Sequence, residues 1–207
     1  MTPSPTTGLA AEIETLIRAR YPILYLVTSE ELRAEEIVSE VAQRRQKKVF
    51  EWSCSTGMIP AGTSIQSQRS RNLATRDPLA ALEQVIEQVE PAIFVFKDFH
   101  PFLTRSNHAV IRRLKEIALH LKNSFKTIVI ISSVQEIPVE LEKEITVLNV
   151  PLPSREDLEL LLAKILEDVK QFKHISIELD AAGQERLLRM ICCFCAKTSP
   201  TSSPVSR

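Results

Sequence analysis

Glycine is scarce in this chain, which has only four among its 207 residues. None of them lies between Val27 and Arg45, the stretch that follows the first predicted strand. A phosphate-binding loop needs glycines at that point, because bare backbone amides wrap the phosphates while a lysine meets the terminal ones. The turn instead reads Thr28-Ser29-Glu30-Glu31, and its two carboxylates would repel a triphosphate. The sequence therefore excludes a Walker A loop at this turn.

The chain also lacks long apolar runs and an excess of either charge. The longest apolar runs, such as Ala92–Phe96, are far too short to span a bilayer. Residues 1–8 carry no basic segment followed by an apolar one, so we expect no signal peptide. The 26 basic and 26 acidic residues give a formal net charge of zero, which makes a dominant nucleic-acid surface an unfavoured hypothesis.

Cysteines are few and are not spaced like a disulfide framework. Cys54 stands alone, and the other three lie close together near the C-terminus: Cys192, Cys193 and Cys195. This distribution is typical of a protein in a reducing compartment. A zinc site that joins these three to His174 or Cys54 stays an alternative, but adjacent cysteines chelate poorly compared with paired C-x-x-C motifs. We expect no metal in this chain.

What the sequence does contain is a regular alternation of strands and helices. Continuous apolar runs predict buried strands at Ile23–Val27, Val49–Ser53, Ala92–Asp98, Thr127–Ser133 and Ile145–Leu148. Apolar residues at helical spacing predict helices at 9–20, 31–45, 78–89, 110–121, 154–169 and 180–188, with Thr28 and Glu31 as a capping box and Asp77-Pro78, Ser154 and Asp157 as further start signals. This pattern predicts an α/β fold in which a parallel sheet has helices on both faces.

Breaks in the pattern predict four segments. Residues 1–20 form an N-terminal segment and helix, and residues 21–150 form the main α/β domain. Pro151-Leu152-Pro153 then separates a helical segment at 151–189. Residues 190–207 end in a Ser/Thr/Pro-rich stretch that cannot form a core, so we expect a disordered tail.

The carboxyl ends of parallel strands form the working edge of such a sheet. Here that edge would contain Thr28-Ser29, the segment from Asp98 to His100, and Ser132-Ser133. Asp98 ends a run of apolar residues in the manner of a Walker B strand, whose aspartate holds magnesium, although the following Phe99 cannot polarise water. Asp98 is thus either a vestigial Walker B aspartate or a turn cap, and Ser133 is either a sensor-like residue or, with Ser132, a turn former. His100 is either the partner of Asp98 in an acid–base pair or a packed or solvated side chain.

A long segment without periodicity runs from Cys54 to Asp77. Loops beyond about 15 residues in a compact domain are usually functional or disordered. This one contains Arg69, Arg71 and Arg76, which would suit an anion or a protein partner. The alternative is an ordinary solvated loop.

Three segments of the chain resemble one family closely. They are Ile17–Thr28 (IRARYPILYLVT), Pro91–Leu103 (PAIFVFKDFHPFL) and Ile145–Pro153 (ITVLNVPLP), and they resemble the hypothetical chloroplast reading frame 46 family, the AAA proteins of cyanobacteria and red-algal plastids. The resemblance covers residues 9–189. It implies a degenerate AAA-ATPase-like domain that lacks Walker A, with the helices at 151–189 as a partial lid.

The resemblance also implies a role and a place. Family members look like tandem proteins in which a second AAA module carries intact Walker motifs, so ATP and magnesium belong to the full-length protein and no cofactor is expected for this chain. Implied partners are the ATPase module, neighbouring subunits or a client protein, in a cyanobacterial cytoplasm or a plastid stroma. The resemblance further implies a link to photosynthesis or inorganic-carbon use. The tail after Arg189 matches nothing in the family, from which we expect a truncated gene product.

Three functional classes follow. The favoured hypothesis is a non-catalytic regulatory or assembly module of an AAA ATPase. The second is a residual ATP- and magnesium-binding domain that uses Asp98. The third is an unrelated doubly wound α/β enzyme that uses Asp98 and His100. The missing glycine turn weighs against the second class, and the absence of a nucleophile motif weighs against the third.

Overall fold

The computed structural model of the chain describes residues 5–63, 72–170 and 181–198. Contacts divide the chain into two compact units. The larger is Leu9–Val150, and the smaller contains residues 1–8 and 151–207.

A six-stranded sheet forms the centre of the larger unit. Its strands are β1 (Ile23–Val27), β2 (Lys48–Ser53), β3 (Gly57–Pro60), β4 (Ala92–Lys97), β5 (Thr127–Ser132) and β6 (Ile145–Asn149). They lie in the order β3-β2-β4-β5-β1-β6, and every neighbouring pair is parallel except the antiparallel β2 and β3. β1 therefore lies inside the sheet, where Leu24 pairs with Val129 of β5 and Thr146 of β6.

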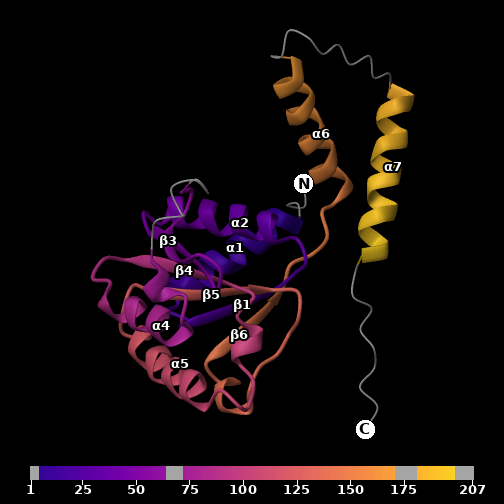
Figure 1. Cartoon of the computed structure of the whole chain (residues 1–207). Helices are drawn as coiled ribbons and strands as arrows, with labels where there is room; N and C mark the ends of the chain where they lie inside the picture. Colours follow the sequence, from indigo (N-terminus) through magenta and orange to yellow (C-terminus); the bar gives the residue numbers. More distant parts are fainter. Residues whose placement is uncertain (1–4, 64–71, 171–180, 199–207) are drawn as a thin grey trace. The chain divides into compact units, whose positions relative to one another are not determined.

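Helices cover both faces of this sheet, as Figure 1 shows. Helices α1 (Pro5–Arg18) and α2 (Glu31–Arg44) pack on the face that presents Leu24, Leu26 and Val129. Helices α4 (Pro78–Glu87) and α5 (His108–Leu121) pack on the face that presents Ile23, Tyr25 and the alternate residues of β4 and β5. Because successive strand residues point to opposite faces, the continuous apolar runs fill both cores. The predicted α/β fold with two covered faces is confirmed.

Polar contacts fix the ends of several helices. Asp77 caps α4 by accepting a hydrogen bond from the Ala80 amide at 3.0 Å, and Pro78 occupies the first helical position, as predicted. At the other end of α4, the buried ammonium of Lys126 donates to the carbonyls of Val85, Ile86 and Gln88 at 2.9–3.0 Å. Lys126, which lies just before β5, therefore caps the C-terminal end of α4.

Two local predictions are wrong at the start of the chain. The capping box of Thr28 and Glu31 does not form: α2 begins after Glu30, and the Thr28 hydroxyl accepts from the Glu30 amide at 3.0 Å instead. Helix α1 is not a segment apart from the domain. It packs Leu9 and Ile13 into the same core as Leu24, because its apolar face is needed to cover the sheet.

The segment predicted as an irregular loop from Cys54 to Asp77 is partly regular. It contains β3, which pairs with β2, and a short 3₁₀ helix at Leu73–Thr75. The Thr75 hydroxyl accepts from the Met58 amide at 2.9 Å, and the Asn72 side chain donates to the Met58 carbonyl at 3.1 Å. These side-chain contacts carry no periodic signal, which is why the pattern missed them.

The smaller unit contains α6 (Arg155–Lys170) and α7 (Ala181–Thr198). The predicted capping box at the start of α6 is confirmed, because the Asp157 carboxylate accepts from the Ser154 amide at 3.0 Å and the Ser154 hydroxyl accepts from the Asp157 amide at 3.1 Å. Arg155 forms an ion pair with Glu185 that joins the two helices. The disorder predicted from Met190 is wrong as far as Thr198, because α7 continues through these residues; Asp180 and 199–207 lie outside the described residues. No helix in the described ranges is long and apolar enough to cross a membrane.

Candidate functional site

The carboxyl ends of β1, β4 and β5 meet at one edge of the sheet. They enclose a pocket of about 190 Å³ lined by Thr28, Ser29, Glu31, Asp98, Ile131, Ser132 and Ser133. The structure therefore brings together the three segments that the sequence placed at this edge. The pocket is smaller than the roughly 300–1,000 Å³ that small-molecule sites occupy.

Asp98 lies at the mouth of this pocket in an unusual backbone conformation. Its φ is 49°, in the left-handed region that favours glycine. Its amide donates to the Ile131 carbonyl at 2.9 Å, so the residue still continues the ladder between β4 and β5. The side chain is exposed, which fits a turn residue as well as a vestigial Walker B aspartate.

Phe99 explains why no second acid follows Asp98. Its side chain is 1% exposed, and its ring packs edge-on against Trp52 at 5.3 Å and Phe96 at 5.1 Å between centroids. The position thus belongs to the aromatic core beneath the turn. A carboxylate could not be buried among these rings without a large desolvation cost.

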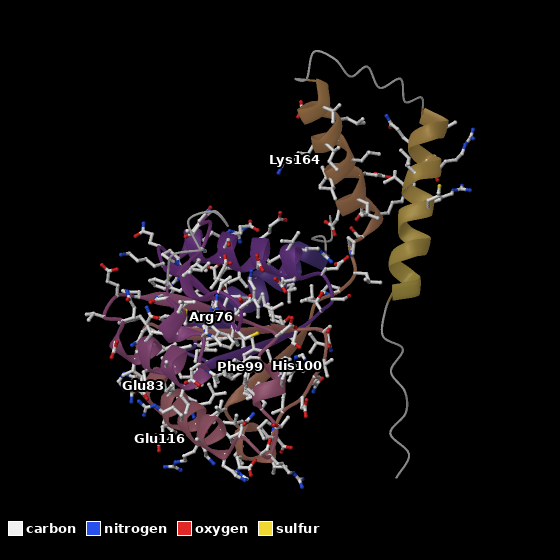
Figure 2. All side chains as sticks on the ribbon, viewed as in Figure 1. Arg76, Glu83, Phe99, His100, Glu116 and Lys164 are labelled. Carbon is white, nitrogen blue, oxygen red and sulfur yellow. The ribbon has the colours of Figure 1, made fainter. Side chains whose placement is uncertain are left out.

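His100 forms a hydrogen-bonded pair with Ser132, one of the residues that line the pocket. The Ser132 hydroxyl lies 2.8 Å from His100 Nδ1 and also accepts from the Val134 amide at 3.2 Å. Nearby, the Tyr25 hydroxyl donates to the Val134 carbonyl at 2.5 Å, and burial raises the pKa of that phenol. Figure 2 shows His100 next to Phe99 at the turn after β4.

Asp98 is not part of this hydrogen-bonded pair in the described residues. Ser132 lines the pocket but is only 2% exposed, and its hydroxyl already contacts His100 Nδ1 and the Val134 amide. Among the described contacts, no hydrogen bond joins His100 to Asp98 or to another carboxylate. Ser133, predicted as a sensor-like residue, is exposed and lines the pocket. The hydrogen bonds to His100 and Val134 are made by its buried neighbour Ser132.

The main electrostatic feature of the edge is a lysine that the sequence analysis did not single out. The Lys97 ammonium lies 2.5 Å from Glu35, 3.1 Å from Glu51 and 3.4 Å from Glu31. Burial lowers the pKa of Lys97, but the hydrogen bonds and charges of Glu35 and Glu51 outweigh it and raise that pKa to about 12. Burial also raises the pKa of the Glu35 carboxyl, against the opposing effect of Lys97. One cation thus joins α2, β2 and β4.

The residues at this edge do not fit Mg-ATP. The turn after β1 has no glycine, and the carboxylate of Glu30, just before α2, is held by Arg33 at 2.7 Å. Lys97, which directly precedes Asp98, is held by three glutamates and is not free to meet a phosphate. The carboxylates of Glu31 and Asp98, which line the pocket, would repel a bound triphosphate.

The remaining candidates from the sequence lie elsewhere. Arg76 is exposed just after the 3₁₀ helix, while Arg69 and Arg71 lie outside the described residues. Cys54 is exposed. The side chains of His174, Cys192, Cys193 and Cys195 are also outside the described part, and no group of three or more metal-binding side chains occurs within it.

Known proteins share both the sequence and the fold. The chain is 34% identical over 161 residues to the AAA domain-containing protein ycf46 of Guillardia theta, covering 76% of this chain and 30% of that protein. The ycf46 protein of Trieres chinensis is 31% identical over 189 residues, covering 87% and 36%. The chain thus spans about a third of the length of these relatives, which come from the plastids of algae.

Solved structures show the same fold at low identity. PCH-2 of C. elegans superposes with a TM-score of 0.51 at 13% identity, covering 86% of this chain and 51% of that one. Domain III of the Thermotoga maritima replication initiation protein DnaA gives a TM-score of 0.51 at 16% identity, covering 100% and 90%. The family model of the SpoVK-like AAA ATPase N-terminal domain matches residues 9–150, which is the larger compact unit. The chain therefore belongs to the family of SpoVK-like AAA ATPase N-terminal domains.

Proposed function

We propose that this chain is a non-catalytic regulatory or assembly module of an AAA ATPase. The observation that carries the proposal is the edge where a nucleotide would lie. Carboxylates replace the glycine-lysine loop there, and Lys97 is committed to Glu31, Glu35 and Glu51. A domain that keeps the fold without the phosphate site has to act through protein contacts, and ATP turnover belongs to another module.

Calorimetric titration of the chain with Mg-ATP tests the absence of a nucleotide site. We expect no saturable heat, and a dissociation constant near or below about 100 μM, roughly −5.5 kcal/mol, would overturn the proposal. Asp98→Ala serves as the matched variant. It should leave the titration unchanged, because no nucleotide contact is lost, whereas a residual magnesium-dependent site would lose affinity.

The proposed partner is the part of a ycf46-like protein that this chain does not match, or a neighbouring subunit. Mixing the chain with the unmatched part of the Guillardia theta relative and measuring co-elution tests this partner. Replacing Arg69, Arg71 and Arg76 together with alanine tests the Cys54–Asp77 segment as the contact. If co-elution is unchanged in that variant, these three arginines do not make the contact and it lies elsewhere.

A further inference from the structure

The opposite edge of the sheet carries a cluster of cations around an exposed aromatic ring. The guanidinium of Arg20, in the turn before β1, lies over the Phe125 ring with its central carbon 5.0 Å from the centroid. The Lys47 ammonium, in the turn before β2, donates to the Phe125 carbonyl at 2.8 Å. Phe125 itself is 62% exposed, and Tyr21 next to Arg20 is 44% exposed. We name the group Arg20, Tyr21, Arg45, Lys47 and Phe125 the amino-edge patch.

The cations of the amino-edge patch have little neutralising charge. In the part of the chain that the structure describes, Arg20 and Lys47 form no ion pair with a carboxylate, and Arg45 has only Glu14 at 4.0 Å. Burial, and then the positive charge of Arg45, lower the pKa of Lys47 to about 8. The surroundings thus destabilise the charged form of Lys47, and a bound anion would stabilise it.

The backbone at Arg20 also adopts a conformation that is unfavourable for a residue with a side chain. Arg20 has a φ of 60°, the left-handed position just after α1 where glycine is the usual residue. Its guanidinium nevertheless lies over the exposed Phe125 ring. An apolar ring bordered by unpaired cations is suited to a ligand that combines negative charge with an apolar group.

We propose that the amino-edge patch binds a short acidic peptide segment of a partner protein, one that also carries an aromatic or aliphatic side chain. Arg20 and Lys47 pair with its carboxylates, and Phe125 and Tyr21 pack against its apolar side chain. This inference rests on the proposed function, because a module without nucleotide chemistry works through partners.

Charge complementarity favours a peptide over a nucleic acid. The patch is small and bordered by acidic residues: Glu14 near Arg45, Glu40 on Arg44 and Glu90 on Lys48. A phosphodiester chain has one charge per nucleotide and needs a continuous basic path, which these carboxylates interrupt. The formal net charge of zero supplies no long-range attraction for a polyanion either.

Fluorescence anisotropy with the complete chain tests the proposal. The probe is a labelled peptide of about a dozen residues, alternating Asp and Glu around two Phe, with a dissociation constant expected on the order of 10–100 μM. Arg20→Gly should weaken binding about tenfold or more without lowering the thermal midpoint, because glycine suits the backbone there. Lys47→Met should weaken it as well. Gln46→Gly is the matched control: Gln46 has a φ of 52° and no charge, so its removal should leave affinity unchanged.

Three results would overturn the proposal. They are no saturable signal up to about 1 mM peptide, equal affinity in Arg20→Gly and the parent chain, or tighter binding of a single-stranded oligothymidylate than of the acidic peptide. The last result would assign the patch to nucleic acid. None of these outcomes depends on Mg-ATP binding, so failure here leaves the nucleotide titration as a separate test of the proposed function.

Discussion

At the scale of single residues, the scarcity of glycine has a direct structural consequence. Arg20, Gln46, Asn72 and Asp98 all have positive φ values between 49° and 63°, a region that L-residues with a side chain enter at a cost. Arg20 and Gln46 follow α1 and α2, and each donates its amide to the carbonyl three residues back, while the next residue donates to the carbonyl five residues back. These are positions where glycine normally ends a helix.

Gln46→Gly should therefore stabilise the chain. Relief of the left-handed strain exceeds the extra entropy of glycine in the unfolded chain, for a net gain of about 0.5–1 kcal/mol. Urea unfolding followed by circular dichroism measures it. Gln43→Gly, inside α2, is the control and should destabilise the chain by about 1 kcal/mol. Glycine there relieves no strain and only increases the conformational entropy of the unfolded chain. A loss of stability in Gln46→Gly would mean that the Gln46 side chain makes a favourable contact.

Lys97 gives the second residue-scale prediction. Lys97→Met should lower the free energy of unfolding at pH 7 by about 2 kcal/mol, because Glu31, Glu35 and Glu51 are left facing one another. The deficit should shrink as the pH falls toward about 4.5, where glutamates protonate. In the parent chain the folded pKa of Lys97 lies above its ordinary value, so its contribution is complete below about pH 10 and is lost as the pH rises through about 12.

Denaturant unfolding of both chains at several pH values checks this prediction. Lys48→Met is the matched control, because Lys48 and Glu90 form an ion pair with side chains 62% and 55% exposed. Exposed pairs contribute less than about 1 kcal/mol, so this variant should change little at any pH. A deficit in Lys97→Met that does not vary with pH would show that lost packing, not carboxylate repulsion, is its cause.

At the scale of elements, the sequence predicted what periodicity can encode. All five parallel strands and the helices between them followed from apolar runs and helical spacing, because one chemical rule, burial against a covered sheet, decides each of them. β3 was missed because its four residues lie in a polar segment and are held by β2 and by the side chains of Asn72 and Thr75. The Lys97 network was missed for a similar reason, since its glutamates come from α2 and β2, far apart in sequence.

Gly57→Ala tests the element that the sequence missed. Gly57 has a φ of 73°, and a Cβ there would lie 2.4 Å from the Asn72 carbonyl oxygen. The methyl group would push β3 away from the 3₁₀ helix, so we expect a loss of about 2 kcal/mol or more, measured by thermal unfolding. Gly62→Ala is the control: it has a similar φ of 74°, but a Cβ meets nothing within 4 Å. Equal losses in the two variants would attribute the effect to φ alone and not to the close approach.

At the scale of the whole molecule, the faces of the sheet form the core, and its two edges carry the charged clusters. The two covered faces of the sheet make the larger unit self-sufficient, while its two edges differ in charge: carboxylates with Lys97 at one, and the cations of the amino-edge patch at the other. The ionic edge that lacks a phosphate site is internally neutralised. At the cationic edge, Arg20 and Lys47 have no carboxylate partner among the described ion pairs, so this edge is the better candidate for an intermolecular contact.

A chain shortened to end at Val150 tests whether the larger unit folds by itself. Both of its cores are built from residues 9–150, so we expect cooperative unfolding with a thermal midpoint within about 3 °C of the full chain. Leu160, Leu161 and Ile165 of α6 are 71%, 53% and 47% exposed. The full chain should therefore bind a hydrophobic dye, and the shortened chain should bind much less. Leu161→Glu in the full chain separates the causes, because it should lower dye fluorescence without changing the midpoint. Loss of cooperative unfolding on shortening would instead show that residues after Val150 are needed to complete the core.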